Sequence, residues 1–131
     1  MHNDGRFVRW THDDVTFTAE AVAAFERHLL TSEAAAKYVI AVTHHPPFRG
    51  LTFPRVGPVT PDGLLWDAFS GNQALESLLA RHGDRVSLAF CGHTHRARQA
   101  DLAGIRGFNV GSDYPFKRLL RVDWPGGAVR E

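Results

Sequence analysis

The stretch YVIAVTHHPP, residues 38–47, decides the fold class of this chain. Its first five residues form a short, nearly continuous apolar run, which is typical of a strand buried on both faces in a layered α/β protein. Two successive prolines cannot both continue a central strand, so the chain must leave the sheet at Pro46 and Pro47. A second stretch, VSLAFCGHTH at residues 86–95, also runs from an apolar strand straight into histidines. If the two strands are neighbours, their histidine-bearing loops meet at one edge of the sheet.

Two helices are expected around the first strand. Residues 18–31 have apolar side chains at helical spacing and begin with Thr18 as a suitable N-cap. Residues 72–82 repeat the pattern and stop at Gly83. The intervening residues 48–71 are rich in glycine and proline, so they are predicted to form a long loop that could act as a lid or a binding loop.

Three short strand-like segments follow the second histidine motif, at residues 96–101, 105–110 and 117–124. The order is therefore helix, strand, helix, strand and then strands only. This order predicts an α/β fold in which the first strands are parallel and the last strands form an antiparallel meander. Residues 1–16 are expected to be an irregular N-terminal segment, and residues 17–131 a single domain.

Composition excludes several classes of partner. Lys and Arg number 15 against 14 Asp and Glu, and the resulting formal charge of +1 gives no electrostatic case for nucleic acid or an anionic membrane. No apolar run approaches the roughly 20 residues that span a bilayer, and residues 1–10 lack the apolar centre of a signal peptide. Cys91 is the single cysteine, so no disulfide within the chain is possible. A reducing, cytoplasmic location is expected.

The histidines at the two strand ends are candidate metal ligands. In an extended segment His93 and His95 would point to the same side, whereas His44 and His45 would point to opposite sides. We therefore expect one ligand from the first pair and two from the second. A lone histidine at a strand end is usually structural, but two groups at one sheet edge favour a site for a transition metal.

The same residues match a known pattern. VTHHPP at residues 42–47, followed by FCGHTH at residues 90–95, resembles the last two motifs of the calcineurin-like metallophosphoesterases. The family pattern runs D-x-H, G-D-x-x-D, G-N-H-D/E, a lone H and then G-H-x-H. NVGS at residues 109–112 resembles the strand and turn that follow G-H-x-H in many members, and by order of elements the resemblance covers residues 17–124.

The resemblance implies a fold, a reaction and a set of site residues. The fold would be the C-terminal half of a two-sheet sandwich flanked by helices, and the reaction would be hydrolysis of a phosphomonoester or phosphodiester by metal-bound water. His44 and His93 would bind one divalent ion of manganese, iron or zinc, and His95 would bind the other. His45 would support the ligands or face the substrate, and Arg96 would either contact a phosphate oxygen or lie in solvent.

The family motifs that normally precede the lone histidine do not occur before His44. Three histidines carry no negative charge, so they bridge two cations poorly, and the catalytic residues stay unassigned. Polar residues near the N-terminus match none of the missing motifs: His2, Asn3, Asp4, His12, Asp13 and Asp14. A second identical copy lacks the same motifs and would not complete the site, so we expect a missing N-terminal half or a partner chain. An oligomer is also expected, because strands left unpaired by a missing half invite association.

Two other functions remain open from the sequence. The chain could be a non-catalytic metal-binding or interaction module that kept the family's fold, with the aromatic residues of 48–71 as a contact surface. It could also be a single-metal hydrolase of another kind built on three histidines. That reaction requires a general base, and the sequence points to none.

Overall fold

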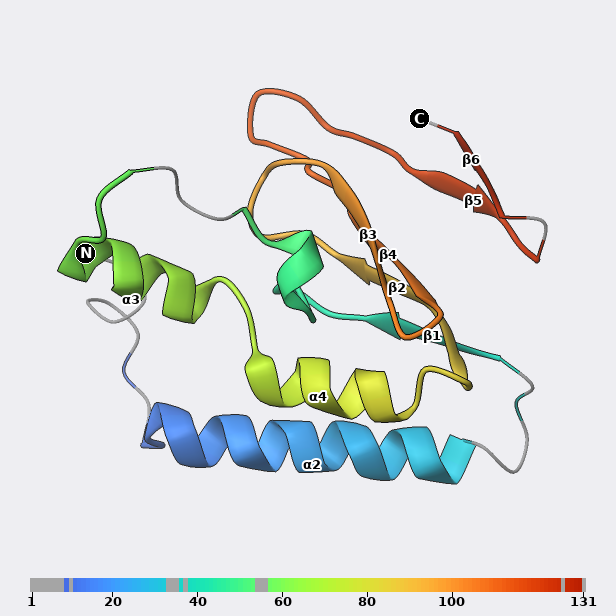
Figure 1. Cartoon of the computed structure of the whole chain (residues 1–131), viewed down its shortest axis with the longest axis horizontal. Helices are drawn as coiled ribbons and strands as arrows, with labels where there is room; N and C mark the ends of the chain where they lie inside the picture. Colours follow the sequence, from blue (N-terminus) through green and yellow to red (C-terminus); the bar gives the residue numbers. More distant parts are fainter. Residues whose placement is uncertain are drawn as a thin grey trace.

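The computed structural model of the chain describes residues 9, 11–32, 36, 38–53, 57–125 and 127–130. Helices α2 (Asp14–Ser32) and α4 (Gln73–Arg81) run side by side along one side of a sheet (Figure 1). The sheet contains β1 (Val39–Val42), β2 (Val86–Cys91), β3 (Arg98–Leu102) and β4 (Ile105–Asn109). The other elements are the 3-10 helix η1 (Arg49–Leu51), α3 (Pro61–Phe69), β5 (Arg121–Asp123) and β6 (Ala128–Arg130).

The four strands lie in the order β1-β2-β4-β3. β1 and β4 both run parallel to β2, and β3 runs antiparallel to β4. The predicted α/β class and the parallel first strands are confirmed. The predicted antiparallel meander is found only in part, because β3 and β4 pair antiparallel but the third predicted segment does not join this sheet. β4 is mostly buried and takes the inner position, while the more exposed β3 lies at the edge, where its polar side chains meet solvent.

β1 does not have two covered faces, as the sequence predicts. Ala41 is 3% exposed and belongs to the core, whereas Ile40 is 50% exposed and Val42 is 72% exposed. Within the described residues β1 hydrogen-bonds to β2 alone, so it is an edge strand of this sheet. Its apolar run is buried on the helix side and open on the other.

A row of small residues crosses the sheet on its covered side. Ala41, Ala89, Gly107 and Ala100 are successive partners in the strand register. A side chain added at Gly107 would overlap the ring of Phe48, which is 2% exposed. The small residues therefore let the segment after β1 pack directly on the sheet, and this packing sets the position of the histidine loop.

α2 begins four residues earlier than predicted. The Asp13 carboxylate accepts a hydrogen bond of 2.9 Å from the backbone N–H of Thr16, so Asp13 rather than Thr18 caps the helix. Hydrogen bonds from Thr16 also lower the pKa of the Asp13 carboxyl group. Residues 14–16 are therefore helical and do not belong to an irregular segment.

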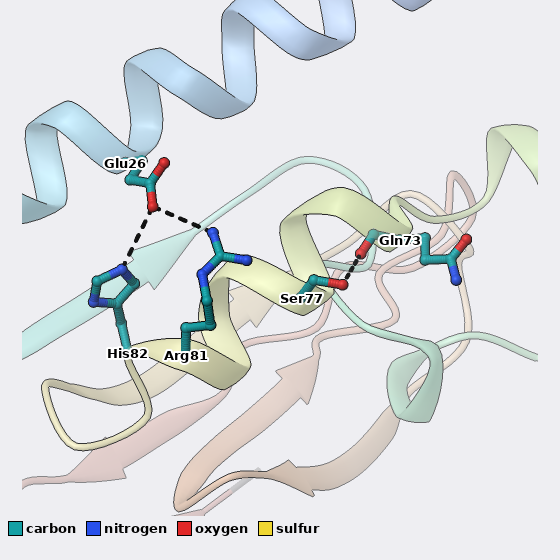
Figure 2. A network of polar contacts seen from close by, with 5 residues as sticks. All are labelled: Glu26, Gln73, Ser77, Arg81 and His82. Atoms are coloured by element: carbon teal, nitrogen blue, oxygen red, sulfur yellow. Dashed lines mark hydrogen bonds and ion pairs between the residues drawn. The ribbon is translucent and has the colours of Figure 1, made fainter.

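α4 matches the prediction of a helix at residues 72–82 to within one residue at each end. The Asn72 side chain caps it by accepting a hydrogen bond of 3.0 Å from the N–H of Leu75. Figure 2 shows how its C-terminal end is attached to α2: Glu26 accepts a hydrogen bond of 3.2 Å from Arg81 and lies 3.7 Å from His82. These polar contacts join the two helices near the surface, and apolar side chains of both helices pack together in the core.

The prediction of one long loop at residues 48–71 is wrong. This segment contains η1 and α3, and residues 54–56 lie outside the described residues. Thr60 caps α3 by accepting a hydrogen bond of 3.1 Å from Gly63, and Pro61 takes the first helical position. The helix signal was present in the sequence as Thr-Pro-Asp, but the many glycines and prolines around it obscured it.

The C-terminal strands form a separate two-stranded sheet. Only Arg121–Asp123 of the predicted strand at 117–124 is a strand, and it pairs antiparallel with β6. The rings of Trp124 and Tyr38 pack in a T-shaped arrangement with centroids 5.4 Å apart, so this hairpin lies near the start of β1. None of the described helices has the length and apolar character that crossing a membrane requires.

Candidate metal centre

Parallel pairing of β1 with β2 brings the two histidine loops together. Val42 lies opposite Phe90, and the N–H of Thr43 donates a hydrogen bond of 3.0 Å to the carbonyl of Phe90. Beyond the strands, the N–H of Gly92 donates a hydrogen bond of 3.1 Å to the carbonyl of His44. The two loops are therefore joined by backbone hydrogen bonds at the carboxyl edge of the sheet, where the sequence predicts the site.

Three histidines form one compact group at this edge. His44, His45 and His93 each offer a ring nitrogen, and these atoms lie within 4.8 Å of one another. Nε2 of His44 is 3.3 Å from Nδ1 of His93, and the rings of His45 and His93 have centroids 4.1 Å apart. His44 and His45 are exposed and His93 is partly buried, so the group is open to solvent on one side.

His45 joins the group against expectation. Strand alternation predicts that His44 and His45 point to opposite sides, but the chain has already left β1 at this point. The Thr43 hydroxyl donates a hydrogen bond of 2.7 Å to the carbonyl of His45, which belongs to a bend. The bend places both rings close to His93. The centroids of the His44 and His45 rings are 4.8 Å apart.

The predicted common direction of His93 and His95 is also not found. Both residues have left-handed backbone angles, with φ of 66° at His93 and 55° at His95, so the segment is a turn and not an extended strand. The N–H of Thr94 donates a hydrogen bond of 2.8 Å to the carbonyl of Gly92 within this turn. His95 lies outside the three-histidine group and contacts Asp113, with Nδ1 3.1 Å from the carboxylate.

Asn109 holds the second histidine loop in place through hydrogen bonds. It is 2% exposed, and its amide donates hydrogen bonds of 2.6 Å to the hydroxyl of Thr94 and 3.2 Å to the carbonyl of Leu51. It thereby ties the turn that carries His93 to the 3-10 helix that follows His45. Sequence reasoning treated Asn109 only as part of a resemblance and assigned it no contact.

Cys91 lies at the end of β2, next to the site but not in it. It is 4% exposed, as expected of a structural residue at a strand end, and burial raises the pKa of its thiol to about 12. Because metals bind the thiolate form, a thiol with this pKa is a poor ligand at neutral pH.

One pair of ring nitrogens in the group has the spacing of two ligands on a single transition-metal ion. Zinc–nitrogen bonds of about 2.0–2.1 Å in a tetrahedral arrangement place neighbouring nitrogens about 3.3–3.4 Å apart. The His44–His93 separation of 3.3 Å already matches this value. No carboxylate among the described residues belongs to the group. Asp13 caps α2 instead, and His2, Asn3 and Asp4 lie outside the described residues.

Arg96 is attached to the loop that follows η1. Its guanidinium lies 4.5 Å from the centre of the Phe53 ring, and Arg98 lies 5.4 Å from the same ring. Arg98 also donates a hydrogen bond of 2.6 Å to the carbonyl of Thr52. These contacts account for the position of Arg96, and a phosphate contact by Arg96 stays a prediction.

This loop also contributes Thr52 and Phe53 to the wall of a cavity of about 740 Å³. The cavity walls come from Arg49, Thr52 and Phe53, from residues 57–60, and from α3, the first half of α4 and the residues between them. They combine apolar side chains with Arg49, Asp67 and Glu76. The three histidines are not among its lining residues.

Comparisons of the chain with protein-family models, with curated proteins and with solved structures give no match. The resemblance to metallophosphoesterases therefore depends on the two histidine motifs and on the residues that accompany them.

Proposed function

We propose that this chain supplies the histidine ligands of a divalent-metal centre that hydrolyses a phosphomonoester or phosphodiester. The observation that carries the proposal is the meeting of His44, His45 and His93 within 4.8 Å at the carboxyl ends of two parallel strands. The order of the motifs, H-H-P-P and then G-H-T-H, supports the phosphoesterase class over other metal enzymes.

The charge of the ligands favours an anionic substrate. Neutral imidazoles leave the positive charge of a bound ion uncompensated, so a phosphate ester is attracted to it. A divalent ion in such a site supplies Lewis acidity toward a phosphate oxygen and lowers the pKa of a water molecule. His44 and His93 would hold the ion, and His45 would complete the group from the exposed side. Manganese, iron and zinc all accept imidazole ligands.

Carboxylate ligands would come from outside the described residues. A two-metal hydrolase needs negatively charged ligands that bridge its ions, and the three-histidine group contains none. We propose that a partner chain or a further segment supplies them at the open side of the group. Activity would then depend on that partner, while metal binding by the histidines would not.

The second candidate is a non-catalytic metal-binding or interaction module. Two observations favour it: the group lacks a carboxylate among the described residues, and the edge strand β1 exposes Ile40 and Val42. An exposed apolar edge is a suitable contact surface for another protein. This candidate requires one bound ion or none and no hydrolysis with any metal.

Metal analysis followed by an activity assay separates these functions. We expect about one zinc, manganese or iron ion per purified chain, lost in the double variant His44→Ala/His93→Ala and retained in His28→Ala, which alters an exposed histidine of α2. Equal metal content in the wild type and the double variant would contradict the proposed site. Bound metal with hydrolysis of a model phosphodiester supports the enzyme, and bound metal without hydrolysis, even with the complementary segment added, supports the module.

A further inference from the structure

The backbone after β4 packs directly against the backbone after the G-H-T-H turn. Gly111 has a left-handed φ of 73°, and a side chain there would collide with the main chain of Arg96 and Ala97. Glycine at this position allows a close approach between the two segments. The approach brings Asp113, which lies two residues after Gly111, to His95, which comes just before Arg96.

The loop that carries Asp113 is closed by its own hydrogen bonds. The Ser112 hydroxyl accepts a hydrogen bond of 2.9 Å from the N–H of Arg118 and donates one of 3.1 Å to its carbonyl. The N–H of Asp113 donates a hydrogen bond of 3.1 Å to the carbonyl of Phe116. The position of Asp113 is therefore set by the loop itself and does not depend on the contact with His95.

The contact between the two side chains distinguishes the ring nitrogens of His95. Oδ1 of Asp113 is 3.1 Å from Nδ1 of His95, and the edge of the ring meets Tyr114 at a centroid distance of 5.1 Å. A carboxylate oxygen at this distance repels a nitrogen lone pair and attracts an N–H, so the contact favours the tautomer of His95 that has its proton on Nδ1. The lone pair of the neutral ring then lies on Nε2, the nitrogen on the far side from Asp113.

We propose that Asp113 is a positioning residue that holds His95 as an Nε2 ligand for a divalent cation. This inference rests on the metal function proposed above. A carboxylate behind a metal-binding histidine fixes its tautomer and ring orientation and makes it a stronger ligand.

The tautomer of His95 can be measured without metal or activity. In the metal-free protein at about pH 8, where an ordinary imidazole is neutral, nitrogen-15 NMR should show the proton of His95 on Nδ1. Asp113→Ala should remove this preference. Asp113→Asn should weaken it, because an amide can either accept from Nδ1 or donate to it. Circular dichroism should show an unchanged fold in both variants, since the bonds between Ser112 and Arg118 remain.

Zinc affinity, measured by competition with a chelator, tests the effect on the metal. We expect Asp113→Ala to weaken zinc binding about 10- to 100-fold, and Asp84→Ala, an exposed control in the turn after α4, to leave it unchanged. His95→Ala should cause a loss at least as large, and adding Asp113→Ala to it should cause no further loss, because Asp113 acts through His95.

The outcomes separate this role from the proposed function. Zinc bound equally by the wild type and Asp113→Ala, losses that add in the double variant, or a His95 proton on Nε2 would each overturn the role of Asp113 alone. A wild-type chain that binds no zinc would overturn the metal function and the role of Asp113 with it.

Discussion

At strand β1, the two faces of the four-stranded sheet differ sharply in how they are covered. On one face Ala41, Ala89 and Cys91 pack in the core with α2, α4 and the segment around η1. On the other face Ile40 and Val42 of the same strand remain largely exposed. Adjacent residues of β1 therefore have opposite environments although all four are apolar. The comparison shows that an apolar run establishes a strand but does not determine how many of its faces are covered.

The largest expected effect concerns the thiol on the covered face. With its pKa raised to about 12, Cys91 should hold about a thousandfold less thiolate at pH 8 than an ordinary thiol with a pKa near 9. Alkylation by iodoacetamide should therefore be slow in the folded protein and fast in urea. The sign follows from burial, which favours the neutral thiol. Equal rates in both conditions would show that the covered face is open to solvent.

Removing a core side chain on the helix side should cost the most stability. Leu79 of α4 is fully buried in the main cluster. Leu79→Ala should lower the free energy of unfolding by about 2–5 kcal/mol, because it removes apolar contacts and leaves a cavity. Chemical denaturation monitored by circular dichroism measures the change. A loss below about 1 kcal/mol would mean that α4 does not pack on the sheet as described.

A hydroxyl group introduced into the same core should have a smaller cost. Val86 of β2 is completely buried, and threonine has nearly the same shape. Val86→Thr should lower the free energy of unfolding by about 1–3 kcal/mol, because it buries a polar group in an apolar setting. The same denaturation experiment gives the value.

The identical substitution on the open face provides the matched comparison. Val42→Thr should change the free energy of unfolding by no more than about 0.5 kcal/mol, because the side chain is already in solvent and threonine keeps the branched shape that strands favour. If Val42→Thr proved as costly as Val86→Thr, then the open face would be covered in solution, and the change in molecular mass with concentration would show whether a second copy covers it.

Local sequence patterns were sufficient for several elements. β1, β2 and α4 were predicted with nearly correct ends, because each has an apolar period and a clear terminating residue. The start of α2 was missed because Asp13 and Thr18 can both cap a helix, and in the structure the Asp13 side chain makes the capping hydrogen bond with the N–H of Thr16. The meander was only partly correct: β3 and β4 pair antiparallel as expected, but β4, the more buried of the two, lies next to β2.

For the candidate site, too, some features follow from the local sequence and others from the tertiary structure. The sequence by itself determined that two apolar strands end in histidines, since strand period and proline positions are properties of neighbouring residues. Only the tertiary structure decided that His45 joins His44 and His93, because a bend after β1 changes the direction of its ring. Likewise, only the approach of Gly111 to the turn pairs Asp113 with His95. Contacts between residues far apart in the chain depend on packing, and no local pattern specifies them.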